Sequence, residues 1–202
     1  MPRLHVAAGA VVAAIAVAAL VTFYPRKPHR DPPPVIAALP RFQLTDQGGQ
    51  PFDSDARLRG QPWVANFIFT RCTTVCPVFT AKMAAFEQRT RERGERLKLV
   101  SFSVDPEYDT PEVLAAYAAQ HQANLARWSF LTGPVDSIKH VVTDSLKIAL
   151  EKQPDKPVGQ SILHGTHFAL VDAAMNVRGY YDLADADAID RMLADLALLG
   201  SK

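Results

Sequence analysis

Residues 67–77 read Phe-Ile-Phe-Thr-Arg-Cys-Thr-Thr-Val-Cys-Pro, so an apolar stretch typical of a buried strand runs directly into both cysteines of the chain. Three residues separate Cys72 from Cys76, and Pro77 is tolerated in the first turn of a helix. A helix that begins here places both thiols on or near one face, where they can converge on a single point. Its positive N-terminal end stabilises a thiolate, the form that binds metal or attacks a disulfide.

A structural role for the two cysteines is the alternative, either as a disulfide at the helix entrance or as two buried thiols. A disulfide that closes so short a loop would constrain the unfolded chain only slightly, so stability alone is a poor reason for the pair. Two cysteines are also too few for a disulfide-rich scaffold or for a four-sulfur zinc site. The pair therefore acts alone or together with histidine.

The composition is that of an ordinary globular protein. The chain has 202 residues, of which 48% are hydrophobic and 21% charged, enough for one substantial domain with extensions. The formal net charge is +1, and no basic run is interleaved with aromatic residues. We therefore expect no nucleic-acid partner.

The N-terminal region predicts export. Residues 6–24 are apolar without a charged side chain, which is long enough to span a bilayer. We interpret residues 1–24 as a single transmembrane anchor or as a signal segment cut near residues 16–18. The basic residues after it favour the opposite orientation by the positive-inside rule, but thiol chemistry suits an oxidising compartment. We expect the domain in the periplasm, held at the bacterial inner membrane.

Residues 25–40 contain six prolines and predict a stiff, extended tether. The folded domain is expected over residues 41–202, beginning with a β-hairpin around Gly48 and Gly49. Strands and helices then alternate. We expect strands at 63–70, 97–104 and 128–131, and helices that begin after Cys76, begin at Thr110 and cover 135–150. A loop at 151–163, a hairpin at 167–181 and a closing helix around 189–196 should follow.

This order is typical of a thioredoxin-like α/β domain, with a central mixed sheet flanked by helices. The cysteines then lie at the carboxyl end of a central strand, where ligands collect in open α/β sheets. Copper(I) is a soft ion that two thiolates and one imidazole would satisfy. His164 and His167 are the candidates for that imidazole.

Three motifs occur in a fixed order along the chain: Cys-x-x-x-Cys-Pro at 72–77, Ser-Val-Asp-Pro at 103–106 with Asp-Thr-Pro at 109–111, and a histidine ahead of Leu-Val-Asp. The last histidine is His164, eight residues before Asp172. With these motifs the chain resembles the Sco/SenC family, copper-binding thioredoxin-like proteins that help to assemble the binuclear copper site of cytochrome c oxidase.

The resemblance runs from about Phe42 to the C-terminus and includes the N-terminal anchor. It implies a copper ion held by Cys72, Cys76 and His164, with Asp105 as a neighbour of the site. It also implies a metallochaperone whose partner is the copper-site subunit of the oxidase, with a periplasmic copper carrier or a thiol reductant as a further partner.

The chain departs from the family at two places. Thr73 stands where many members have a proline. His167 is an extra imidazole that could compete with His164 for the copper or donate a hydrogen bond to one of the copper ligands. Asp105 could steady the site electrostatically or could simply be a turn residue before proline.

Two enzymatic functions stay open. In a thiol-disulfide oxidoreductase, Cys72 and Cys76 would be a redox pair that reduces the cysteines of the oxidase copper site, although such work usually goes with Cys-x-x-Cys. In a thiol peroxidase, Cys76 would be the peroxide-reactive cysteine, since Thr73 precedes it by three residues. His164 discriminates, because copper binding needs it and thiol exchange does not.

Overall fold

The computed structural model describes residues 31–200 except 154, 159–161 and 165, and Pro32–Lys202 form one compact unit. The predicted anchor or signal segment, residues 1–24, lies outside the described residues. Within the described ranges, no helix is both long enough and apolar enough to cross a membrane.

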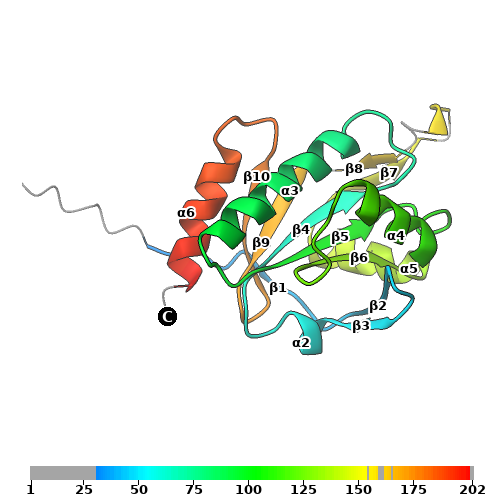
Figure 1. The fold of residues 1–202 in the computed structure, drawn as a ribbon. Helices are drawn as coiled ribbons and strands as arrows, with labels where there is room; N and C mark the ends of the chain where they lie inside the picture. The colour runs from blue at the N-terminus through cyan, green and yellow to red at the C-terminus, as the bar shows by residue number, and fades with distance from the viewer. Residues whose placement is uncertain (1–30, 154, 159–161, 165, 201–202) are drawn as a thin grey trace, which may run out of the picture. The chain divides into compact units, whose positions relative to one another are not determined.

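An eight-stranded mixed sheet forms the centre of the domain (Figure 1). The contacts β4–β5 and β5–β6 are parallel, and the other contacts are antiparallel. This confirms the predicted thioredoxin-like architecture with its N-terminal hairpin. In spatial order the strands are β1 (Ala37–Ala38), β10 (Asn176–Asp182), β9 (His167–Val171), β4 (Trp63–Ile68), β5 (Lys98–Ser103), β6 (Trp128–Thr132), β2 (Gln43–Asp46) and β3 (Pro51–Asp53).

Strand β4 is central because apolar layers cover both of its faces, and all six of its residues are buried. Successive side chains of a strand point to opposite faces. Trp63 and Phe67 accordingly enter one hydrophobic cluster, whereas Val64 and Ile68 enter the other. The residues that follow β4 therefore lie near the middle of the sheet, at the carboxyl ends of its parallel strands.

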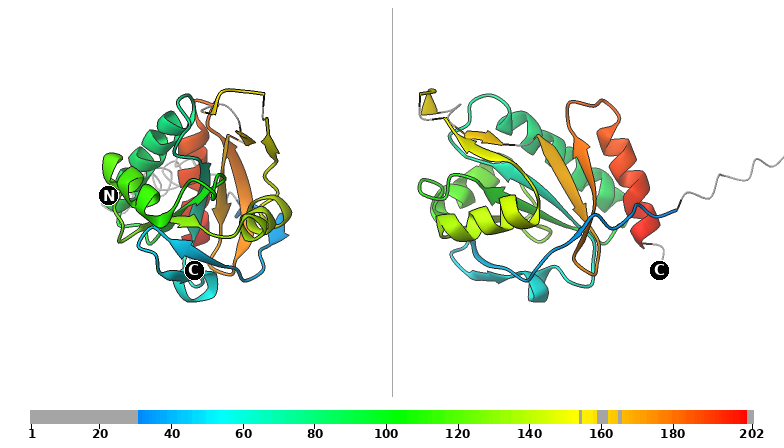
Figure 2. Two further views of the ribbon diagram at one scale, coloured as in Figure 1. Left: turned by 90° about the vertical axis from the view of Figure 1, so that its right-hand side faces the viewer. Right: turned by 180° about the vertical axis from the view of Figure 1, so that it is seen from behind.

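Helices cover both faces of the sheet (Figure 2). Buried residues of α3 (Cys76–Glu92), α4 (Pro111–Gln120) and α6 (Ala188–Gly200) share one cluster, with Met83, Leu114 and Met192 among them. On the other face lie α5 (Val135–Lys139) and the π-helical segment η1 (His140–Ser145). A short helix α2 (Ser54–Arg57), which the sequence did not predict, follows β3.

The segment after η1 differs from the prediction. The helix expected to reach Leu150 ends at Ser145, and Lys147 has a left-handed backbone with φ 56°. Strands β7 (Leu150–Lys152) and β8 (Ile162–His164) then pair as a separate two-stranded sheet. The predicted helix is therefore too long, and the predicted loop at 151–163 includes strand residues at both ends.

The predicted tether also takes part in the fold. Ala37 and Ala38 pair with β10, and Leu39 is buried in the core. The Nε of Arg178 donates a hydrogen bond to the carbonyl of Pro33 at 2.7 Å. The sheet therefore begins inside the range predicted as tether, before Arg41.

Candidate functional site

Cys72 and Cys76 meet at the carboxyl end of β4, where the chain turns into α3. The Cys72 N–H donates to the Phe69 carbonyl at 3.0 Å, which closes the turn after the strand. Cys76 is the first residue of α3, with Pro77 following in its first turn. Both cysteines are buried and neither forms a disulfide, and Cys72 Sγ accepts a hydrogen bond from the Cys76 N–H at 3.4 Å. The structure thus brings the two predicted cysteines together.

The two thiols are electrostatically unequal. A hydrogen bond from the Cys76 thiol lowers the pKa of Cys72 to about 4, against the opposing effect of burial, and the N–H groups of Cys76 and Thr74 add to it. The same contact and burial raise the pKa of Cys76. Cys72 is thus a thiolate at neutral pH, and Cys76 would have to release its proton to bind a metal as a thiolate.

Asp109 holds the backbone just before the cysteines, a role that the sequence analysis missed. Its carboxylate accepts hydrogen bonds from the Thr70 hydroxyl at 2.6 Å, the Thr70 N–H at 3.2 Å and the Ser103 hydroxyl at 2.6 Å. Burial raises the pKa of Asp109 in spite of these donors. The sequence signal for this role is the Asp-Thr-Pro motif at 109–111.

Asp105 is both a turn residue and an electrostatic anchor. Its carbonyl accepts the N–H groups of Tyr108 and Asp109 at 3.0 and 2.9 Å. Its buried carboxylate accepts hydrogen bonds from Arg71 Nη2 at 2.5 Å and Nε at 3.0 Å. The Arg71 guanidinium also lies 4.3 Å from the ring centroid of Tyr108. Asp105 therefore ties the residue before Cys72 to the segment after β5.

The histidines are less fully described. His164 is the last residue of β8, where it pairs with Leu150, a residue that packs against the cluster containing both cysteines. Its side chain lies outside the described part of the structure, so its role as third ligand stays a prediction. His167 Nε2 lies 4.0 Å from Asp182 Oδ2 on β10. Among the side chains that are described, no group of three His, Cys, Asp or Glu could hold a metal ion.

The chemistry of the two sulfurs suits a soft metal ion. They lie side by side in an apolar cluster, and one of them is already ionised. Thiolates select soft ions such as copper(I). Cys76 as a peroxide-reactive cysteine is disfavoured, because it is fully buried and its raised pKa keeps the thiol protonated.

Comparison with known proteins shows which family the chain matches. The SCO1/SenC family model matches residues 30–199. The SCO1 protein homolog of Bacillus subtilis is 32% identical over 157 residues, which are 77% of this chain and 79% of that protein.

Two solved structures share the fold at higher coverage. BsSco, a member of the Sco family of cytochrome c oxidase assembly proteins with an identified disulfide switch, superposes with a TM-score of 0.75 and 29% identity over 85% of this chain and 99% of that chain. ScoI of Bradyrhizobium japonicum, solved with copper bound, gives a TM-score of 0.67 and 26% identity over 81% of this chain and 99% of that chain.

Proposed function

The chain belongs to the SCO1/SenC family, and we propose that it is a copper chaperone that binds one copper ion through Cys72, Cys76 and His164 and delivers it to the copper site of cytochrome c oxidase during assembly. The observation that carries the proposal is the pair of adjacent cysteines at the end of β4, which are not joined by a disulfide. Copper bound to ScoI and the oxidase-assembly role of the Sco family support the choice of metal and of partner.

The two thiolates would supply most of the affinity for copper, and an imidazole would complete a three-ligand site without oxygen. Such a site allows transfer, because a ligand of the acceptor can replace one ligand of the donor at a time. Oxidation of Cys72 and Cys76 to a disulfide would remove both thiolates. Copper loading should therefore require the reduced protein.

We place the domain in the periplasm, held at the bacterial inner membrane by residues 1–24. This part of the proposal rests on the apolar run at 6–24 and on the two cysteines, whose thiol chemistry suits an oxidising compartment. Fractionation of cells that express the full chain would test it. Recovery of the chain in the cytoplasmic fraction would contradict it.

Copper stoichiometry of the reduced full chain tests the ligand set. We expect about one copper per chain for the parent and for His167→Ala, the matched control, and loss or strong weakening for Cys72→Ser, Cys76→Ser and His164→Ala. Equal loss in His164→Ala and His167→Ala would contradict the choice of His164. Equal copper binding by the oxidised protein would contradict the dithiolate site.

A thiol-disulfide oxidoreductase is the second candidate, favoured by the low pKa of Cys72 beside a protonated partner thiol. The same variants separate the two functions. Thiol exchange needs both cysteines but not the imidazole, so it should persist in His164→Ala. Tight copper binding should be lost in that variant. Rapid exchange without tight copper in the parent would favour the enzyme.

A further inference from the structure

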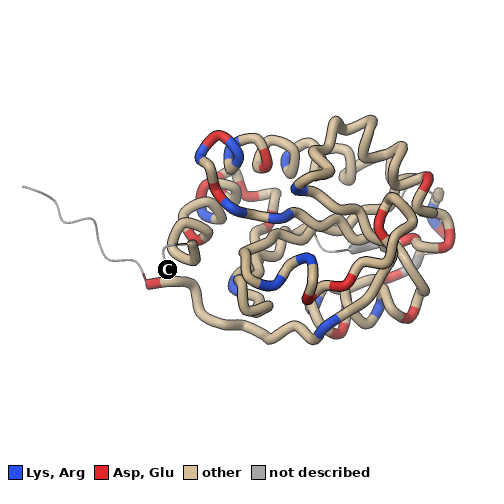
Figure 3. Tube along the Cα trace, turned by 60° about the horizontal axis from the view of Figure 1, so that its bottom comes forward, with Lys and Arg blue, Asp and Glu red and all other residues tan. Residues whose placement is uncertain are grey.

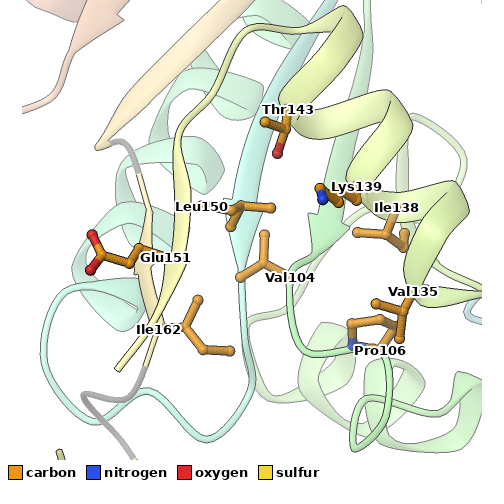
Figure 4. Close-up of a pocket in the computed structure, with 9 residues that line it drawn as sticks. All are labelled: Val104, Pro106, Val135, Ile138, Lys139, Thr143, Leu150, Glu151 and Ile162. Carbon is orange, nitrogen blue, oxygen red and sulfur yellow. The ribbon is translucent and has the colours of Figure 1, made fainter. Parts of the chain in front are cut away.

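A cleft beside the β7–β8 hairpin has no part in the proposed copper site. The volume of the cavity is about 220 Å³. One wall comes from α5 and η1 and the other from the hairpin, with the segment after β5 between them (Figure 4). Nine residues line it: Val104, Pro106, Val135, Ile138, Lys139, Thr143, Leu150, Glu151 and Ile162.

The position of the cleft connects it to both halves of the proposed site. Val104 and Pro106 flank Asp105, which Arg71 ties to the cysteine turn. Ile162 lies on β8, the strand that ends at His164. Ile162 and Val104 also share a hydrophobic cluster with Cys72 and Cys76. A molecule in the cleft would therefore contact the elements that carry the predicted ligands.

The size of the cleft favours a single side chain. Pockets for drug-sized ligands and cofactors have volumes of roughly 300–1,000 Å³, and this cavity is smaller. Most of its lining is apolar, and one lining residue, Val135, is 45% exposed. An aromatic side chain presented by another protein is an occupant of suitable size and polarity.

One wall carries a buried hydroxyl without a partner. The Oγ1 of Thr143 is buried and has no hydrogen-bond partner among the described residues. Threonine in a helix often bonds the carbonyl three or four residues earlier, but Thr143 lies in the π-helical segment η1. Figure 4 shows its oxygen facing the space between the helix and the hairpin. A buried hydroxyl left unpaired costs about 1–3 kcal/mol. Water does not reach this oxygen in the structure, so a side chain that enters the cleft must displace the groups that cover it before it can pair with it.

The same wall carries an unpaired positive charge. Lys139 lies four residues before Thr143 and lines the cleft, and the described residues give its ammonium no ion pair or hydrogen bond. On the opposite wall, Figure 4 shows the carboxylate of Glu151 pointing away from the cleft. The cleft thus combines apolar walls with one hydroxyl and one unpaired cation. It complements an apolar ring with a polar tip and a neighbouring carboxylate.

We propose that this cleft docks the protein that receives the copper, by taking up a tyrosine or tryptophan side chain that has an acidic residue beside it. The inference rests on the proposed function. Ligand exchange requires the acceptor to reach Cys72 and Cys76, and an anchor in the cleft holds it next to them. Tyrosine and tryptophan are also the side chains that most often dominate the binding energy of protein interfaces.

Two variants test the docking site without touching a predicted copper ligand. Thr143→Val removes the hydroxyl at constant shape, so the fold should be as stable as the parent or more stable, whereas affinity for the partner should fall about 3- to 10-fold. Lys139→Glu reverses the charge, and affinity should fall about tenfold or more, with slower association at low salt. Lys98→Glu, at the opposite end of β5 from Val104, makes the same charge change and should leave affinity unchanged.

The measurement is the dissociation constant for the purified, copper-free oxidase subunit that carries the copper site, with the copper content of each variant measured in parallel. Unchanged affinity in Thr143→Val and Lys139→Glu at normal copper content would overturn the docking site and leave the chaperone function standing. A parent that holds no copper would overturn the chaperone function instead. Loss of stability in Thr143→Val would show that its hydroxyl serves the fold, against the proposal. A change in self-association in place of partner affinity would identify a second copy as the occupant and would also overturn it.

Discussion

Hydrogen bonds between the two cysteines determine which thiol is ionised and which keeps its proton. Cys72 accepts hydrogen bonds from both the thiol and the N–H of Cys76, so the negative charge settles on Cys72. The Cys76 thiol is fully buried and keeps its proton. In the proposed copper site one thiolate would already be formed, and the second would form when the metal displaces the proton of Cys76.

This division predicts an unusual pH dependence of alkylation. The pKa of Cys72 is lowered to about 4, so the thiolate fraction is already saturated at pH 6 and the alkylation rate of Cys72 should be flat from pH 6 to 8. Cys76, whose pKa is raised, should stay unmodified. In the urea-unfolded chain both cysteines should have a pKa of about 8.5, with rates that rise about tenfold per pH unit below it. Peptide mass spectrometry after iodoacetamide treatment measures both sites. The same steep rise in the folded chain would contradict the assignment.

The hydroxyl of Thr70 is predicted to stabilise the turn before the cysteines. Thr70→Val removes the donor that lies 2.6 Å from the buried carboxylate of Asp109. Hydrogen bonds to charged groups contribute about 1.5–3 kcal/mol, so the free energy of unfolding at pH 7 should fall by about that amount. Thr70→Ser, which keeps the hydroxyl, should stay within about 1 kcal/mol of the parent. Urea denaturation of the three proteins checks this, and equal stability of Thr70→Val and Thr70→Ser would refute it.

Among the elements, α4 depends on its N-cap. The side chain of Thr110 accepts a hydrogen bond from the Val113 N–H at 3.3 Å, and Pro111 opens the helix, as the sequence predicts. Thr110→Ala should lower the free energy of unfolding by about 1 kcal/mol. Thr110→Ser keeps the cap oxygen and serves as the control. Thermal or urea denaturation measures the stability of both variants. A Thr110→Ala variant as stable as the parent would show that the cap does not contribute to stability.

The elements also show what local patterns predict. Strand β4, helix α3 and the hairpin β9–β10 follow from apolar periodicity and from Pro77, signals that lie within each segment. The end of η1 cannot be predicted from such local signals, because Leu146 and Ile148 continue the apolar pattern while Lys147 adopts a left-handed backbone. Strand β7 likewise needs its partner β8, which lies beyond a long connection.

The candidate site divides in the same way. Cys72 and Cys76 could be placed from their own spacing and from the strand before them. The anchor of Thr70 on Asp109 could not, because 39 residues separate the two and tertiary packing alone brings them together. The sequence does not decide between the two roles of Asp105 for the same reason, since its ion pair with Arg71 joins the ends of the neighbouring strands β4 and β5, 34 residues apart.

At the scale of the whole molecule, the N-terminal approach to the domain is part of the sheet. The N–H of Ile36 donates to the carbonyl of Val177 and that of Leu39 to the carbonyl of Met175, both at 2.8 Å. Strand β1 thereby covers the edge of β10 (Figure 1). In Figure 3 charged residues of both signs are spread over the trace, which agrees with the formal net charge of +1. Backbone pairing with the sheet therefore begins at Ile36, inside the range predicted as tether.

Leu39→Ala tests whether this segment stabilises the entire domain. The side chain of Leu39 is 6% exposed and packs in the cluster that also contains both cysteines. Leucine-to-alanine changes in a core cost about 2–5 kcal/mol, and since Leu39 lies near the edge of the sheet we expect the lower part of this range. Val35→Ala is the matched control, because Val35 is 56% exposed and surface changes usually stay within about 0.5 kcal/mol. Denaturation curves followed by both tryptophan fluorescence and far-ultraviolet circular dichroism should shift together in Leu39→Ala. A tether that only spaces the domain from the membrane would give two variants of equal stability, because neither side chain would then belong to the core.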